Sequence, residues 1–126
     1  MVILDTSVWV EFLKGKEPFF KKITTLLEEN QVYALECIFA ELMQGTLNSR
    51  ERDIIYEYWK NLPKAEVKNV FLKAGIESGK NKWLSKGIGL IDSVIILSAR
   101  ETSSRIWTLD KKLKDILEKE EIFESV

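Results

Sequence analysis

The chain has 126 residues, of which 45% are hydrophobic and 31% charged, and its formal net charge is −1. This length and composition predict one globular domain over residues 1–126, and the small charge argues against indiscriminate coating of nucleic acid. The absence of histidine excludes Ser-His and Cys-His catalysis and most zinc sites, so any chemistry has to use carboxylates, hydroxyls, lysines or a metal ion.

Apolar runs and helix-period stripes alternate along the chain. In chain order they predict a strand at 2–4, helices at 8–13 and 18–29, a strand at 32–35, helices at 38–47, 48–62, 70–86 and 91–101, a strand at 106–109, a helix at 112–117 and a short strand near Phe123. Strands that alternate with helices indicate an α/β fold, namely a three-layer α/β/α sandwich around a mainly parallel sheet.

The cellular compartment is predicted from what the sequence lacks. The single cysteine, Cys37, cannot form an intramolecular disulfide. No apolar run reaches the roughly 18 residues that cross a bilayer, and no basic segment precedes an apolar one at the N-terminus. We therefore expect a cytoplasmic protein that does not enter a membrane.

Two acidic residues directly follow predicted strands. Asp5 ends the strand at 2–4, and Asp110 ends the strand at 106–109. Because sites in open parallel sheets form beyond the carboxyl ends of the strands, we expect both acids at one edge of the sheet. Each acid also has a simpler interpretation, as the cap of the helix that follows it. Thr108 points to the same side of its strand as Asp110 and is predicted to orient that carboxylate.

Two further acids stand on helix faces that should pack against other elements. Glu41 has Cys37, Ile38, Gln44 and Gly45 at helical spacing, a weakly polar face suited to burial, although an exposed Glu41 remains an alternative.

Asp92 faces an apolar stripe, because Ile95, Ile96 and Ala99 follow it at helical spacing. A carboxylate in such a stripe is costly unless it is paired, protonated or bound to a cation. Its place in the first turn of a helix also fits simple capping.

A cluster of these four carboxylates would suit a hard divalent cation, Mg²⁺ or Mn²⁺. Without a cation, like charges a few Å apart would repel and raise one another's pKa. A bound ion orients a water molecule, lowers its pKa and stabilises charge on a phosphodiester during displacement.

Four sequence segments, taken in order, are each built around one of the acids. They are LDTSVW around Asp5, AELMQG around Glu41, GLIDSVIILSAR around Asp92 and WTLDKKL around Asp110. Together they resemble the PIN-domain family, and more narrowly the VapC-type ribonuclease toxins of prokaryotic toxin–antitoxin pairs. The resemblance extends over nearly the whole chain.

Carried over residue by residue, the resemblance implies that the four acids form the catalytic, metal-binding centre, with Ser7 and Thr108 in support. It implies metal-dependent cleavage of RNA within the strand, leaving a 5′-phosphate and a 3′-hydroxyl. It also implies a homodimer and inhibition by a small VapB-like antitoxin whose tail fills the acidic groove.

The chain departs from the family pattern after Asp110. Many relatives carry a further acid two residues later, followed by an aromatic residue, whereas this chain has Lys112 and Leu113. This leaves a one-metal mechanism and a second ion brought by RNA both open. It is also the one feature that favours a non-catalytic PIN-like module that binds RNA or a partner. A phosphatase with an aspartyl nucleophile at Asp5 is disfavoured, because Ser7 stands where that class needs an acid.

Basic residues flank the motif segments, and any of them could contact RNA phosphates or simply be surface charge. They are Lys14, Lys16, Lys80, Lys82, Lys86, Arg105, Lys111 and Lys112. Trp9 and Trp83 are candidates for stacking on bases, with core packing favoured for Trp9.

Overall fold

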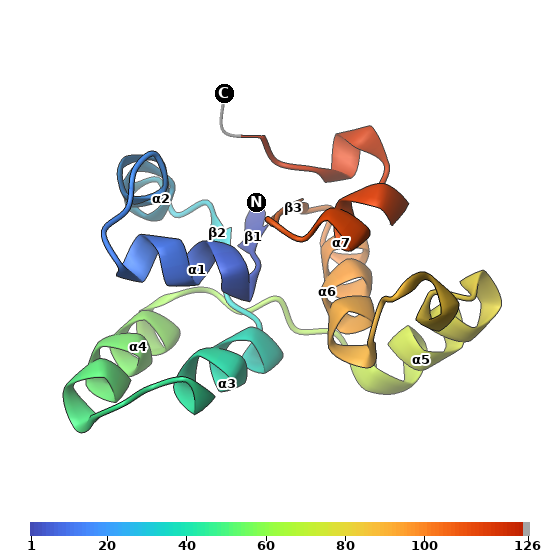
Figure 1. The fold of residues 1–126 in the computed structure, drawn as a ribbon, viewed down its shortest axis with the longest axis horizontal. Coiled ribbons are helices and arrows are strands. Elements are labelled where there is room, and N and C mark those ends of the chain that lie inside the picture. The colour runs from blue at the N-terminus through green and yellow to red at the C-terminus, as the bar shows by residue number, and fades with distance from the viewer. Residues whose placement is uncertain (125–126) are drawn as a thin grey trace.

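The computed structural model describes residues 1–124 (Figure 1). Ser125 and Val126, which the predicted domain includes, lie outside the described residues. The elements in chain order are β1 (Val2–Leu4), α1 (Thr6–Leu13), α2 (Phe19–Glu28), β2 (Val32–Tyr33), α3 (Glu36–Gln44), α4 (Ser49–Asn61), α5 (Val70–Asn81), η1 (Leu84–Lys86), α6 (Leu90–Glu101), β3 (Arg105–Trp107), α7 (Lys111–Ile116) and η2 (Lys119–Glu121).

A parallel sheet with the strand order β2-β1-β3 lies at the centre of the fold. Ile3 of the middle strand pairs with Tyr33 on one side and with Ile106 on the other. Isolated parallel bridges extend the sheet at both edges, from Ala34 to Lys64 and from Ile106 to Ile122. The predicted α/β sandwich with a parallel sheet is therefore confirmed, and the predicted strand near Phe123 is reduced to a single bridge.

Helices flank the sheet on two sides, as the separation of the elements in Figure 1 shows. Helix α1 packs against α2, α3 and β1, and α4 packs against α3. On the other side α6 packs against β3 and α5 packs against α6. The sheet is buried as a result: Ile3, Leu4 and Ile106 are all 0% exposed. Such strands read as continuous apolar runs because both of their faces are covered.

The predicted helix at 70–86 is wrong in its length. Helix α5 ends at Asn81, where Lys82 adopts a left-handed conformation with φ of 55°. The amide N–H of Trp83 then donates to the carbonyl of Ser78 at 3.1 Å, and the indole ring turns into the core, where it is 5% exposed. Burial of Trp83 is therefore what ends the helix, and it also removes this ring as a platform for base stacking.

Other boundaries shift by smaller steps. Helix α1 begins at Thr6 rather than at residue 8, and α3 spans Glu36–Gln44 rather than 38–47. Strand β3 ends at Trp107, two residues before the predicted end. Helices α1 and α3 thus begin earlier than predicted, whereas β3 ends directly before Thr108, whose hydroxyl donates to Asp5.

No helix among residues 1–124 combines the length and the apolar character that crossing a bilayer requires.

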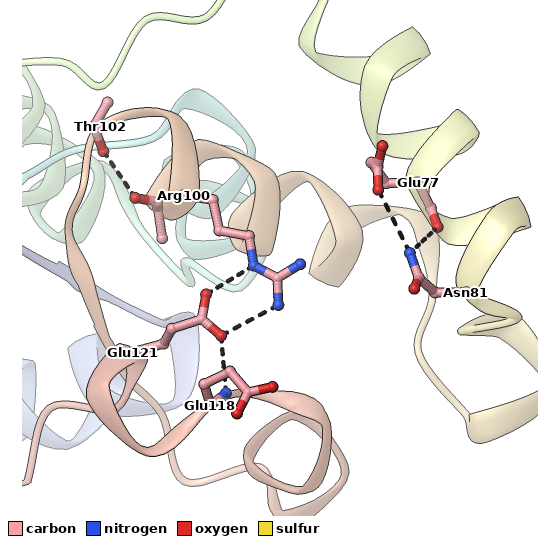
Figure 2. Close-up of polar contacts among 7 residues, drawn as sticks. Glu77, Asn81, Arg100, Thr102, Glu118 and Glu121 are labelled. Carbon is pink, nitrogen blue, oxygen red and sulfur yellow. Dashed lines mark hydrogen bonds and ion pairs between the residues drawn. The ribbon is translucent and has the colours of Figure 1, made fainter.

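An ion pair fastens the C-terminal segment to α6 (Figure 2). Arg100 donates from Nε and Nη2 to the two carboxylate oxygens of Glu121, at 2.7 and 3.2 Å. The amide N–H of Glu118 donates to Oε1 of Glu121 at 2.8 Å. The hydrogen bonds from Arg100 hold the pKa of Glu121 below its ordinary value of 4.5. This pair keeps η2 and the bridging residue Ile122 at the edge of the sheet.

Replacing Glu121 by glutamine should lower the free energy of unfolding by about 1 kcal/mol at neutral pH, as expected for a partly exposed two-point pair. Because the pKa is lowered in the folded state, the stabilisation is complete above the ordinary value of 4.5 and is lost as the pH falls through the lowered value. Urea unfolding of wild type and Glu121→Gln at several pH values measures this. An equal difference at pH 7 and pH 3 would contradict it, and exposed Glu120→Gln is the control.

Candidate active site

Asp5 lies buried at the carboxyl end of β1, with 8% of its surface exposed. Its backbone continues the sheet, because its N–H donates to the carbonyl of Trp107 at 2.9 Å. Its carbonyl accepts from Val8 and Trp9, at 3.0 and 3.1 Å, and so starts α1. Asp5 is therefore the junction between the central strand and the first helix, and its main chain is hydrogen-bonded to both.

Three donors surround the carboxylate of Asp5. The amide of Thr6 donates to Oδ1 at 2.7 Å, as an N-cap interaction. The hydroxyl of Thr108 donates to Oδ2 at 2.6 Å, and that of Ser7 reaches the same oxygen at 3.4 Å. The capping interpretation and the site interpretation of Asp5 are thus compatible, because one oxygen caps the helix and the other meets hydroxyls.

Thr108 and Ser7 tie the ends of β1 and β3 together. Thr108 is 1% exposed, and its hydroxyl oxygen accepts from the amide of Asp110 at 3.0 Å while its proton goes to Asp5. The prediction that Thr108 orients the carboxylate of Asp110 is therefore wrong, because the carboxylate that Thr108 contacts is that of Asp5. A single hydroxyl has one proton to donate, and Asp5 receives it. Ser7 makes a second link, because its hydroxyl oxygen accepts from the amide of Leu109 at 3.3 Å.

Asp110 is half-buried at the start of α7. Its Oδ1 accepts from the amide of Lys112 at 2.9 Å, which caps the helix as the sequence suggested. Lys112 lies across Gly87, whose φ is +83°, and a Cβ built there would lie 3.0 Å from Cδ and 3.3 Å from Nζ of the lysine. The lysine thus packs against the turn that precedes the helix of Asp92.

Glu41 is exposed, so the prediction that its helix face is buried is wrong. One helical turn before it, Cys37 is half-buried, which shows that the face turns toward solvent along α3. Glu41 lines two clefts, one of about 690 Å³ shared with α5 and α6 and one of about 330 Å³ between α1, α3 and α4. Its carboxylate therefore stands at an opening rather than in the core.

The hydroxyl of Thr6 donates to Oε1 of Glu41 at 2.7 Å. No local sequence pattern indicates this contact, because the partner of Thr6 stands 35 positions away along the chain. The one sequence feature that could have drawn attention to Thr6 is its position directly after Asp5, the acid that ends the first predicted strand.

Asp92 is half-buried in the first turn of α6, whose N-cap Gly89 has no side chain to offer. Burial raises the pKa of this carboxyl above its ordinary value of 3.8, and the charges of Asp5, Asp110 and Glu41 raise it further. The charges of the other three predicted acids therefore reach Asp92.

The same field reaches the thiol of Cys37. Burial raises the pKa of this thiol to about 11, and the charges of Glu41 and Asp5 contribute in the same direction. Cys37 is thus a neutral thiol at physiological pH, and it offers no thiolate for nucleophilic chemistry or metal binding.

In residues 1–124, no three acidic or cysteine side chains stand close enough, as they are oriented here, to hold a metal ion together. The residue types nevertheless fit a hard divalent cation, since all four donors are carboxylates and Asp92 carries the unfavourable charge that such an ion would neutralise. Closure around an ion then requires side-chain rotation, for which the exposed Glu41 has room.

Comparison with known families matches residues 2–119 to the PIN domain model. The chain belongs to the PIN domain family. A curated relative, Ribonuclease VapC32 of Mycobacterium tuberculosis, is 27% identical over 115 residues, which cover 90% of this chain and 88% of the relative.

Two solved structures share the PIN domain fold of this chain. FitAcB from Neisseria gonorrhoeae is 21% identical, with 90% of each chain covered and a TM-score of 0.61. VapBC2 from Rickettsia felis, bound to a DNA fragment from their promoter, is 18% identical, with 98% of each chain covered and a TM-score of 0.71.

Replacing Asp92 by asparagine should stabilise the metal-free PIN domain at pH 7. Because the pKa of Asp92 is raised in the folded state, stability falls as the pH rises from the ordinary value of 3.8 through the raised value. Thermal unfolding in EDTA should therefore show a higher Tm for Asp92→Asn at pH 7, and the advantage should shrink toward pH 3.5.

The exposed Asp115→Asn in α7 serves as the matched control and should leave the Tm nearly unchanged. A lower Tm for Asp92→Asn at pH 7 would show that the carboxylate is well compensated and that the four acids do not repel one another.

Proposed function

We propose that this protein is a VapC-type endoribonuclease that uses Mg²⁺ or Mn²⁺ and acts as the toxin of a toxin–antitoxin pair. The observation that carries the proposal is the buried carboxylate of Asp5, which Thr108 and Thr6 hold at the carboxyl end of β1 in a PIN domain. The raised pKa of Asp92, which results from burial and from the charges of the three other acids, supports it. Carboxylates collected at the carboxyl edge of a parallel sheet are the arrangement expected for a cation-dependent site.

In this proposal the ligands of the ion are Asp5, Glu41, Asp92 and Asp110. The hydrogen bonds to Asp5 support its assignment, because Thr108 holds one oxygen while Thr6 holds the other through its amide. When bound, the ion supplies a water molecule of lowered pKa and neutralises charge on the phosphodiester.

Side chains of the protein would orient the ligands and accept a proton from the attacking water. The hydrogen bonds from Thr108, Ser7 and Thr6 hold the carboxylate of Asp5 in one orientation, which limits the reorganisation needed during reaction. Because the chain has no histidine, one of the four carboxylates is also the available base for the attacking water.

Lys112 stands two residues after Asp110, at the start of α7. Its side chain lies against Gly87, and the residue is exposed, so it is available to a phosphate of bound RNA. A cation here, where many relatives carry an acid, favours the mechanism with one ion held by the protein.

The proposed partners are RNA, a small VapB-like antitoxin and a second copy of the chain. Support for the antitoxin comes from the name VapBC2 and from the relative's name, Ribonuclease VapC32. The clefts beside Glu41 are where an antitoxin tail would block access to the acids. The proposal places the protein in the cytoplasm, as one domain over residues 1–126.

The proposal predicts that purified protein cuts RNA with Mg²⁺ or Mn²⁺ and that Asp92→Asn and Asp5→Asn each reduce cleavage at least about a hundredfold, since each removes a ligand of the ion. Cleavage of a labelled RNA pool, followed on denaturing gels with and without EDTA, measures this. Asp115→Asn should cut like wild type. Cleavage that survives EDTA and both site variants would refute the proposal.

Binding of RNA without cleavage by the wild type, in either metal, would instead favour the non-catalytic module. Titration of Mn²⁺ into the protein distinguishes a non-catalytic module from an enzyme that was given an unsuitable RNA. A non-catalytic module should show no measurable Mn²⁺ binding.

A further inference from the structure

Thr6 contacts two of the predicted metal ligands at once. Its backbone N–H donates to Oδ1 of Asp5 at 2.7 Å, and its hydroxyl donates to Oε1 of Glu41 at 2.7 Å. The first bond is made by the main chain and exists for any residue but proline. The second depends on the hydroxyl, so it is the side chain of Thr6 that relates the two carboxylates to each other.

The need for such a contact follows from where Glu41 stands. Glu41 is exposed on α3, whereas Asp5 is 8% exposed and fixed by the backbone at the end of β1. An exposed glutamate has three rotatable bonds and occupies many rotamers, so it loses entropy when an ion orders it. A hydrogen bond to one oxygen restricts these rotamers before any ion arrives and leaves the other oxygen free.

The contact also joins two elements. Thr6 is the first residue of α1, and Glu41 belongs to α3, which packs against α1. A β-branched residue has few χ1 rotamers, so the hydroxyl of Thr6 is itself held in direction. The position of Glu41 relative to Asp5 is therefore set by the packing of two helices rather than by a flexible side chain alone.

We propose that Thr6 is a positioning residue that pre-orients Glu41 toward Asp5 and thereby sets the affinity of the site for a divalent cation. The inference rests on the proposed function for the identity of the site. It assigns to Thr6 a role that is neither helix capping nor contact with RNA. Residues that orient metal ligands by hydrogen bonds typically change metal affinity by about 10- to 100-fold when they are removed.

The test compares Thr6→Val and Thr6→Ser by calorimetric titration of Mn²⁺ into protein stripped with EDTA. Valine keeps the shape and the backbone N–H but removes the hydroxyl, and serine restores the hydroxyl. We expect Thr6→Val to weaken Mn²⁺ binding by about tenfold and Thr6→Ser to bind within about threefold of wild type. The Tm in EDTA should change little, because Thr6 is half-buried and keeps its capping bond.

Thr24→Val is the matched control. The hydroxyl of Thr24 is also half-buried on a helix and also makes one bond of 2.7 Å, to the carbonyl of Phe20 in the first turn of α2. This variant should bind Mn²⁺ like wild type.

Asp92→Asn separates failure of this inference from failure of the proposed function. If wild type binds Mn²⁺, Asp92→Asn does not, and Thr6→Val binds as tightly as wild type, then Thr6 has no positioning role and the site stands. If wild type and Asp92→Asn bind Mn²⁺ equally well, or neither binds, the metal site itself is wrong and the role of Thr6 is refuted with it. A loss in Thr6→Ser equal to that in Thr6→Val would also overturn the inference, since the hydroxyl would not be the cause.

Discussion

The hydrogen bond from the hydroxyl of Thr108 to Oδ2 of Asp5, at 2.6 Å, joins the carboxyl ends of the two strands on which the candidate site depends. It exists because β1 and β3 are adjacent and parallel, so both strands end at the same edge of the sheet. The acceptor oxygen of Thr108 then fixes the backbone of Asp110. A single buried threonine thus relates two acids that are 105 positions apart.

The other two proposed ligands stand on helices. Asp92 lies in the first turn of α6, and Glu41 lies on α3, where the hydroxyl of Thr6 donates to it. Burial and the charges of the other three acids raise the pKa of Asp92, so its negative charge opposes folding. A fold that retains such an arrangement gives up stability at the site, as functional sites commonly do. The closed core around Ile3, Leu4 and Ile106 supplies stability elsewhere.

Much of this could be predicted from the sequence, because the strands and the buried helix are marked by local patterns. The apolar runs before Asp5 and Asp110 located the strands, and the alternation of strands and helices indicated the parallel sheet. The end of α5 could not be predicted, because it depends on the burial of Trp83 in the core. No local sequence pattern indicates that burial.

The sequence indicates which acids are candidates for the site, but it does not indicate their exposure or their hydrogen-bond partners. Asp92 stood out because a carboxylate within an apolar stripe demands an explanation. The exposure of Glu41 was misjudged, because helical spacing reveals which neighbours share a face but not whether another element covers it. The partners of Thr6 and Thr108 lie 35 and 103 positions away, and such pairings depend on helix packing and strand order.

The proposed activity depends on one divalent ion that binds among Asp5, Glu41, Asp92 and Asp110. Anomalous scattering from a crystal of the protein soaked in Mn²⁺ tests this most directly, because it locates the ion independently of any activity. We expect a Mn²⁺ peak at the carboxyl edge of the sheet, ligated by Asp5 and Asp92 and by at least one of the other two carboxylates. Mn²⁺ bound only at other carboxylates, or no peak at this edge at saturating Mn²⁺, would contradict it.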